Sequence, residues 1–263
     1  MASVQPLRAV TDPSPTEAGA ALFEHFLAEV ARAALDEWLP ASPSHILDLS
    51  HDYAQLVGLM VARGHTVVHA DPHAIVPEVG PAGGQLVAVR GDTRNLDWLA
   101  DGAVDVVVAE GGMLSEALAA ELTIEDLHRV LQPGGRLLLC VESLVSGLSR
   151  LADQGCWAEL ADVPAADVVL VPAPDGSVIR CFWPEELHAM LGDAGFRVEW
   201  VRPRTVLSEQ TVVHALRVDP GQLDSLVATE LALSRRRQGE SIGAQLVASA
   251  VRLPVGPREG NTA

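Results

Sequence analysis

The chain contains no lysine and only three cysteines. All 18 of its basic residues are arginine, which is typical of a high-GC, actinobacterial-type composition. The absence of lysine excludes a Schiff-base mechanism and a phosphate-binding P-loop. The cysteines Cys140, Cys156 and Cys181 are scattered, with no Cys-x-x-Cys pair. Cys140 ends an apolar run and is expected in the core, and neither Cys156 nor Cys181 is expected to act as a nucleophile.

Long hydrophobic runs and a basic surface are also missing. No window holds 18 uninterrupted apolar residues, so no membrane span is expected. The N-terminus lacks a basic-then-apolar signal pattern, which makes the cytoplasm the expected location. The net charge of −17 argues against nucleic acid as a partner. The one basic run, Arg235–Arg237, is interpreted as the end of a solvated helix.

Short β-rich runs alternate with helical ones from residue 45 onward. Strands are expected at His45–Leu49, Thr66–Ala70, Gln85–Val89, Val104–Ala109, Arg136–Val141, Phe196–Val201 and 244–252. Helices are expected at Thr16–Leu39, Tyr53–Arg63, Leu114–Leu131, Pro184–Ala194 and Gln222–Arg237, with Thr123 and Asp126 as a capping pair. This alternation of strands and helices predicts a doubly wound α/β protein with a parallel sheet. Its last two segments are expected to pair antiparallel at the edge of the sheet.

The organisation predicted around this sheet is a single domain with two tails. Residues 1–14 and 254–263 are expected to be flexible tails around a domain of residues 15–253. Residues 143–182 contain several prolines and little periodicity, which indicates a loop or lid. Residues 204–240 are expected to be a helical insertion. Trp157 and Trp183 flank the irregular stretch, where they would anchor the lid or line an apolar substrate pocket.

Acidic residues follow four of the expected strands. The first two strands end at Asp48 and Asp71, and Asp92 and Glu110 follow the third and fourth. In doubly wound sheets, ligands bind at the carboxyl ends of the strands. A carboxylate after the second strand can accept from both hydroxyls of a ribose, and one after the third from an adenine amino group. The alternative is that these residues cap helices or turns.

Several segments recur in this order in one known family. They are Ile46–Leu49, Asp71, Gly91-Asp92, Val104–Ala109, Val130–Leu139 with its Pro133-Gly134-Gly135 turn, Trp183–Leu187 and Ala194–Phe196. Together they resemble the class I S-adenosylmethionine-dependent methyltransferases over roughly residues 16–252. The resemblance implies a Rossmann-like seven-stranded sheet with an antiparallel last strand, S-adenosylmethionine as cofactor and a small-molecule acceptor.

The resemblance also implies roles for the residues at the strand ends. Asp71, with Pro72 beside it, would hold the ribose hydroxyls of the cofactor, and Asp92 with Thr93 would meet the adenine. Glu110 and Gly111 would lie beside the cofactor, near the substrate entrance. The N-terminal helix and the 143–181 stretch would cover the substrate.

The first loop departs from the family pattern. Asp48 is present, but Ser50, Asp52 and Ala54 stand where the family has glycines that let the backbone approach the ligand. Asp48, Ser50 and Asp52 remain the cofactor-binding candidates of this loop. A second anion at about 4 Å from the cofactor carboxylate would cost about 1–4 kcal/mol.

Three functions are therefore compatible with the sequence. The chain is a methyltransferase with a divergent loop, or it has lost the cofactor and acts as a binding, scaffold or regulatory partner of another protein, or it runs other chemistry on the same fold, such as a cyclisation.

Three possible metal ligands occur at alternate positions near the end of the second strand. They are His69, Asp71 and His73, which an extended chain would place on one face. Because the segment crosses a strand end and Pro72, the preferred interpretation is a buried or capping His69 and a solvated His73, with no metal site.

No catalytic base is assigned from the sequence. His51 lies in the first loop and is a weak candidate, since many methyl transfers depend mainly on positioning the nucleophile in line with the sulfonium methyl. Glu110 is a candidate for orienting an acceptor amine or hydroxyl. His128 and His188 lie in helical runs and are expected at the surface.

Overall fold

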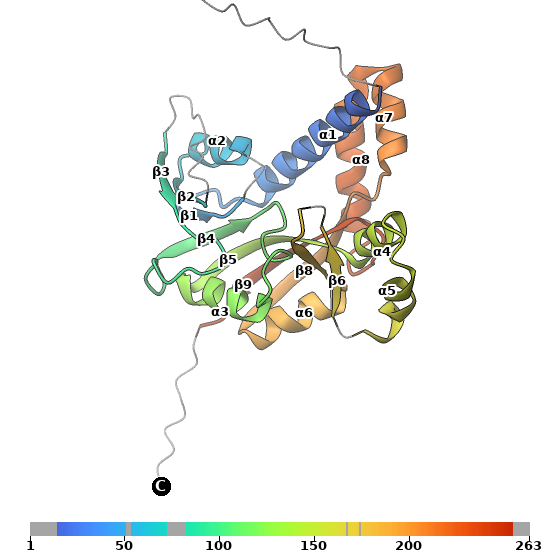
Figure 1. The fold of residues 1–263 in the computed structure, drawn as a ribbon. Helices are drawn as coiled ribbons and strands as arrows, with labels where there is room; N and C mark the ends of the chain where they lie inside the picture. The colour runs from blue at the N-terminus through green and yellow to red at the C-terminus, as the bar shows by residue number, and fades with distance from the viewer. Residues whose placement is uncertain (1–14, 51–53, 73–82, 167, 174, 255–263) are drawn as a thin grey trace, which may run out of the picture.

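The chain folds around one seven-stranded sheet (Figure 1). The structure is a computed structural model, and it describes residues 15–50, 54–72, 83–166, 168–173 and 175–254. The strand order across the sheet is β3-β2-β1-β4-β5-β9-β8. The strands are β1 (His45–Asp48), β2 (Thr66–Asp71), β3 (Gln85–Arg90), β4 (Val104–Ala109), β5 (Leu131–Glu142), β8 (Phe196–Arg204) and β9 (Gln245–Arg252).

Strand direction agrees with the sequence prediction. β3, β2, β1, β4 and β5 are parallel neighbours, and β9 pairs antiparallel with both β5 and β8. The predicted doubly wound, Rossmann-like sheet with an antiparallel last strand is thus confirmed.

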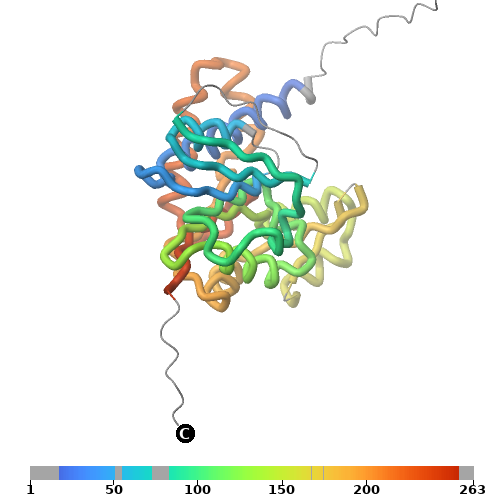
Figure 2. The backbone as a smooth tube through the Cα atoms, turned by 90° about the vertical axis from the view of Figure 1, so that its left-hand side faces the viewer, coloured from blue at the N-terminus to red at the C-terminus, as the bar shows by residue number. Residues whose placement is uncertain are grey.

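Helices cover both faces of the sheet (Figures 1 and 2). Those around the sheet are α1 (Pro15–Trp38), α2 (Ala54–Ala62), α3 (Ala120–Val130), α6 (Pro184–Asp193), α7 (Glu209–Val218), the short 3-10 helix η2 (Pro220–Gln222) and α8 (Leu223–Arg236). The apolar sides of α3 and α6 pack on one face and those of α1 and α2 on the other. In the described part of the chain, no helix has the length and hydropathy needed to cross a bilayer.

Alternation along each strand divides the core into two layers. Leu47, Val107 and Leu137 face α3 and α6, whereas their neighbours Ile46 and Val106 face α1 and α2. β4 is almost entirely buried, as its uniformly apolar sequence predicts. A smaller cluster joins α1 to α7 and α8, which lie beside it in Figure 1.

The stretch after β5 is more regular than expected. It forms α4 (Leu144–Asp153), α5 (Trp157–Asp162), the 3-10 helix η1 (Val163–Ala165) and a hairpin of β6 (Val169–Pro172) and β7 (Val178–Cys181). This unit has a small core of its own. Trp157 and Trp183 are 65% and 39% exposed, so neither is part of a buried core. None of these elements was predicted from the sequence of this proline-containing stretch.

Two boundaries also differ from the prediction. The helix expected from Leu114 begins at Ala120, and Thr123 and Asp126 do not form its cap. Asp126 accepts instead from the backbone of Leu96 at 3.0 Å. The expected Pro-Gly-Gly turn lies inside β5, where the β4–β5 register shifts and Gly134 takes a φ of 81°.

Candidate functional site

The predicted acidic residues lie along one edge of the sheet. β3, β2, β1 and β4 are adjacent and parallel, so their carboxyl ends meet at the same edge. Asp48 stands in register with His69 and Val108, and Asp71 stands in register with Arg90. The topology therefore brings all four strand ends to one edge, in the order β3, β2, β1 and β4.

Asp48 is the centre of a buried hydrogen-bonded chain. Its Oδ1 accepts from the hydroxyl of Ser50 at 2.7 Å, and its Oδ2 lies 2.7 Å from Nδ1 of His69. The Ser50 hydroxyl also accepts from the backbone N–H of Glu110 at 3.2 Å. All four residues are at most 3% exposed. Ser50 thus links the end of β1 to the end of β4.

His69 is the buried partner of Asp48. Burial opposes its protonation, but the hydrogen bond to Asp48 and the charges of Asp48 and Asp71 outweigh burial and raise the pKa of His69. The interpretation of His69 as a buried residue is confirmed. In the described residues, no group of three or more possible metal ligands is found.

Glu110 forms a buried ion pair with Arg204 at the end of β8. The two guanidinium nitrogens of Arg204 lie 2.6 and 2.8 Å from the two carboxylate oxygens. Glu110 is 0% and Arg204 3% exposed. Such a bidentate pair fixes both side chains. Glu110 is thereby engaged by the protein itself, on the side away from its backbone contact with Ser50.

The chain turns sharply after Glu110. Gly111 and Gly112 have φ values of 85° and 79°, a region that side chains with a Cβ rarely adopt. The turn leaves the end of β4 bordered by bare backbone.

The other predicted residues lie at the ends of β2 and β3, on the outer side of the sheet. Asp71 and Thr93 are buried, Pro72 is half-buried, and its carbonyl accepts from Nε of Arg90 at 3.2 Å. The Asp92 side chain is 51% exposed. The backbone N–H of Arg94, together with its side chain, lowers the pKa of Asp92 against the effect of burial. A Cβ at Gly91 would lie 3.3 Å from the ring of Trp98, so glycine allows that indole to pack beside Asp92.

Some of the predicted residues lie outside the described part of the chain. These are His51 and Asp52 of the first loop, together with His73. Of the remaining histidines, His188 is exposed as expected. His128 is half-buried against Phe196, with a ring-centroid distance of 5.1 Å, so its placement at the surface is wrong.

Arg204 is the residue of the site that the sequence analysis missed. The available signal was an arginine on either side of Pro203, in a strand that had been expected to end at Val201. A basic residue in a buried strand requires a carboxylate partner, but only the three-dimensional structure identifies Glu110 as that partner.

The cysteines are not poised for nucleophilic chemistry. Cys140 is buried in the core as expected, and burial raises its pKa well above the ordinary value of a thiol. Burial also raises the pKa of Cys181 to about 12. A thiol of high pKa carries almost no thiolate at neutral pH.

The region around the strand ends is similar in sequence to known methyltransferases. A family model described as "Methyltransferase domain" matches residues 47–139. The ubiquinone/menaquinone biosynthesis C-methyltransferase UbiE of Rubrivivax gelatinosus is 32% identical over 185 residues, which are 61% of this chain and 66% of that protein. An uncharacterized methyltransferase of Mycobacterium tuberculosis is 33% identical over 152 residues, 56% of this chain and 60% of that protein. The chain thus spans slightly less than two thirds of these relatives.

Solved structures with the same fold extend over most of the chain. A SAM-dependent methyltransferase of Methanosarcina mazei has a TM-score of 0.54 at 18% identity, covering 84% of this chain and 98% of that chain. An S-adenosylmethionine-dependent methyltransferase of Mesorhizobium loti has a TM-score of 0.53 at 16% identity, covering 85% and 98%. Residues 47–139 thus match a methyltransferase domain, and the chain has the fold of S-adenosylmethionine-dependent methyltransferases and is similar in sequence to curated methyltransferases.

Proposed function

We propose that this protein is an S-adenosylmethionine-dependent methyltransferase that acts on a small-molecule acceptor. One observation carries the proposal: the segment that matches the methyltransferase model contains the carboxyl ends of β1, β2, β3 and β4 with their acidic residues. When bound, the cofactor supplies a methyl group on a positively charged sulfur.

The residues of the outer strand ends suit the adenosine part of that cofactor. Asp71 would accept hydrogen bonds from the ribose hydroxyls, because a carboxylate offers two acceptor oxygens. Asp92 stays ionised, because the hydrogen bonds from Arg94 lower its pKa, and it would accept from the adenine amino group. The half-exposed Asp92 leaves an open approach for the base.

The inner strand ends suit positioning better than proton transfer. Both oxygens of Asp48 are engaged by Ser50 and His69, and both oxygens of Glu110 by Arg204. For Glu110 to take a proton, it would have to give up a buried ion pair. We therefore assign these residues to shaping the end of β4, with the acceptor placed in line with the methyl group.

The acceptor is proposed to be a small organic molecule. A net charge of −17 disfavours RNA and DNA as substrates. The Rubrivivax relative is named as a C-methyltransferase, which makes a carbon acceptor the first class to test.

Calorimetry with S-adenosylhomocysteine tests cofactor binding. The wild-type protein is expected to bind, and Asp71→Asn and Asp92→Asn are each expected to bind about 10–100-fold more weakly, since each removes a charged acceptor. Asp97→Asn is the matched control, because Asp97 is exposed in the same loop as Asp92. Thermal unfolding of each variant separates a lost contact from a lost fold. The absence of heat at millimolar cofactor would refute the proposal.

A second candidate is a protein that keeps the fold without the cofactor and serves as a binding or regulatory partner. Two features favour it: Ser50 stands at a family glycine position, and Glu110 is already neutralised by Arg204. For this candidate, neither the wild-type protein nor its variants would bind S-adenosylhomocysteine, although all would unfold cooperatively.

A further inference from the structure

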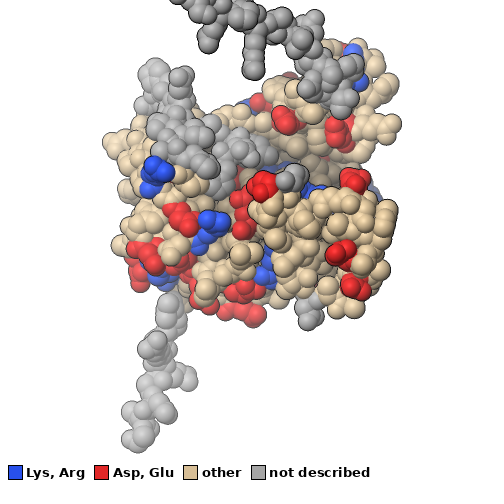
Figure 3. Space-filling model, viewed as in Figure 1, with Lys and Arg blue, Asp and Glu red and all other residues tan. Residues whose placement is uncertain are grey.

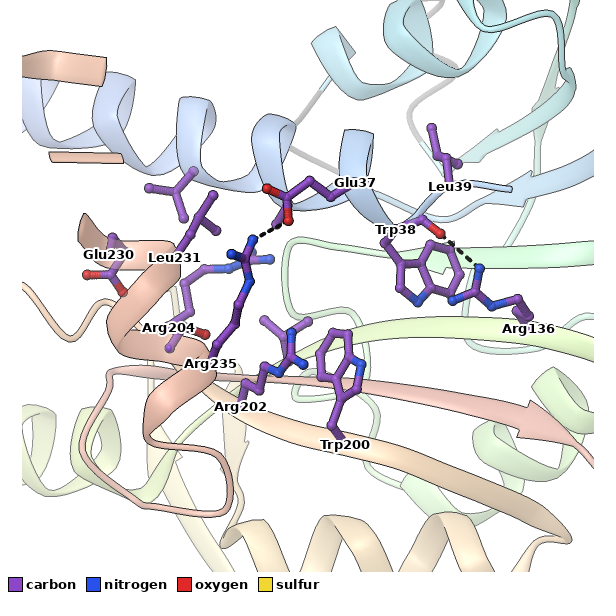
Figure 4. Close-up of a pocket in the computed structure, with 14 residues that line it drawn as sticks. Glu37, Trp38, Leu39, Arg136, Trp200, Arg202, Arg204, Glu230, Leu231 and Arg235 are labelled. Carbon is purple, nitrogen blue, oxygen red and sulfur yellow. Dashed lines mark hydrogen bonds and ion pairs between the residues drawn. The ribbon is translucent and has the colours of Figure 1, made fainter. Parts of the chain in front are cut away.

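A cavity of about 340 Å³ lies between α1, α8 and the face of β8 and β9, beside the strand-end site. Figure 4 shows side chains from both helices and from the sheet around this space. Its volume is within the range of small-molecule sites. Its inner wall is formed by the buried residues Trp38, Arg204, Glu230 and Val247.

Positive charge is concentrated in this cavity, although the molecule as a whole is acidic. Acidic residues outnumber basic ones by 35 to 18 in the whole chain. The cavity is lined by four arginines, Arg136, Arg202, Arg204 and Arg235, but only by two glutamates, Glu37 and Glu230. An excess of arginine in one concave place is the arrangement that selects an anion.

The two glutamates are engaged by the protein. Glu37 forms an ion pair with Arg235 at the exposed side of the cavity. The oxygens of Glu230 each accept from a backbone N–H, those of Val206 and Leu207, at 2.9 Å. Glu110, outside the cavity, holds Arg204. Arg136 also lies within ion-pair distance of a carboxylate, that of Glu199 at 3.7 Å. Three of the four arginines, Arg136, Arg204 and Arg235, are therefore paired with carboxylates.

Arg202 is left without a comparable partner among the described residues. Its Nε is buried and makes no hydrogen bond. Its guanidinium stacks 4.1 Å from the centroid of the Trp200 ring, an orientation visible in Figure 4. Burial and then the charge of Arg235 lower the pKa of Arg202 and outweigh the opposing charge of Glu37. A bound anion would relieve both the missing hydrogen bond and this repulsion.

The rest of the lining indicates a flat, apolar body attached to that anion. Arg136 stacks on Trp38 at 4.3 Å in the same way as Arg202 stacks on Trp200, so two cation–aromatic pairs border the space. Aliphatic side chains complete the wall: Val30, Ala34, Leu39, Leu231 and Val247. We propose that this cavity is a binding site for a planar aromatic carboxylate, whose carboxylate pairs with Arg202 while its ring packs on the tryptophans and aliphatic residues.

Calorimetric titration with 2-naphthoate, in the absence of any S-adenosyl compound, tests the proposal independently of methyl transfer. The wild-type protein is expected to bind 2-naphthoate at least tenfold more tightly than the uncharged 2-naphthamide, and not to bind inorganic phosphate measurably. Arg202→Gln is expected to weaken naphthoate binding at least tenfold. Arg197→Gln, on the same strand but exposed, is expected to leave it unchanged.

A second variant tests the cavity itself. Leu231→Trp would fill the space from α8 without removing Arg202, and it is expected to abolish binding of both naphthyl compounds while thermal unfolding remains cooperative. The proposal is overturned if 2-naphthoate does not bind, if naphthamide or phosphate binds equally well, or if the folded Arg202→Gln and Leu231→Trp variants both bind like the wild-type protein.

Discussion

The bidentate contact between Glu110 and Arg204 joins the end of β4 to the end of β8, two strands that are not neighbours in the sheet. Both side chains are buried, so neither charge can be solvated if its partner is removed. The pair therefore fixes the position of the turn at Gly111, where the ligand site begins.

Removing one member of this pair is expected to destabilise the fold strongly. Arg204→Met leaves the Glu110 carboxylate buried and unpaired, at an expected cost of about 3–5 kcal/mol in the free energy of unfolding. The double variant Glu110→Gln/Arg204→Met is expected to recover most of that loss. Urea unfolding measures both, and a double variant no more stable than Arg204→Met would show that the pair is not coupled.

The Asp48–His69 pair predicts a dependence of stability on pH. The pKa of His69 is raised above its ordinary value of 6.5 in the folded protein. Its contribution to stability is therefore fully present below pH 6.5 and is lost as the pH rises through the folded pKa. His69→Gln keeps a hydrogen-bond donor for Asp48 but does not titrate.

Urea unfolding at several pH values compares the two proteins. The stability advantage of the wild-type protein over His69→Gln is expected to shrink as the pH rises above 6.5. An advantage that grows with pH would mean that His69 is neutral in the folded state.

At the scale of elements, the junction of β8 and β9 is the tightest place near the site. A Cβ on Gly243 would lie 2.1 Å from the carbonyl oxygen of Arg204, with backbone atoms that cannot rotate away. The carbonyl of Gly243 also accepts from the hydroxyl of Ser143, so the two strands and the start of α4 meet at this residue.

Gly243→Ala is expected to lower the free energy of unfolding by about 1–3 kcal/mol, because the added methyl group must push the two strands apart. Gly192→Ala is the control, since Gly192 is exposed in α6 and an added Cβ there meets nothing within 4 Å. That variant should be neutral or more stable by up to about 1 kcal/mol. Equal effects of the two substitutions in thermal unfolding would contradict the account of the junction.

Helices and strands with a regular apolar pattern were predictable from the sequence. Side-chain pairs between distant segments were not. The alternation of apolar strands and amphipathic helices predicted all seven strands of the main sheet, because burial on one or both faces leaves a period in the residues. The hairpin of β6 and β7 was not predicted, because it lies in a stretch with several prolines and no clear pattern. The same limit applies at the site: the order of Asp48, Asp71, Asp92 and Glu110 was readable, but their partners His69 and Arg204 depend on tertiary contacts.

At the scale of the whole molecule, the two sites that we propose for small molecules are adjacent. The first is the row of strand ends from β3 to β4, and the second is the arginine-lined cavity under α1 and α8. Arg204 borders both, since it lines the cavity and holds Glu110. The central claim of the account is that the first of these places holds the adenosine part of the cofactor.

A crystal structure of the wild-type protein soaked with millimolar S-adenosylhomocysteine tests this claim most directly. The account predicts density for the adenosine along the strand ends, with ribose hydroxyls within hydrogen-bond distance of Asp71 and the adenine beside Asp92 and Thr93. Strand ends that remain without ligand density in well-ordered crystals, or adenosine density elsewhere on the molecule, would contradict it.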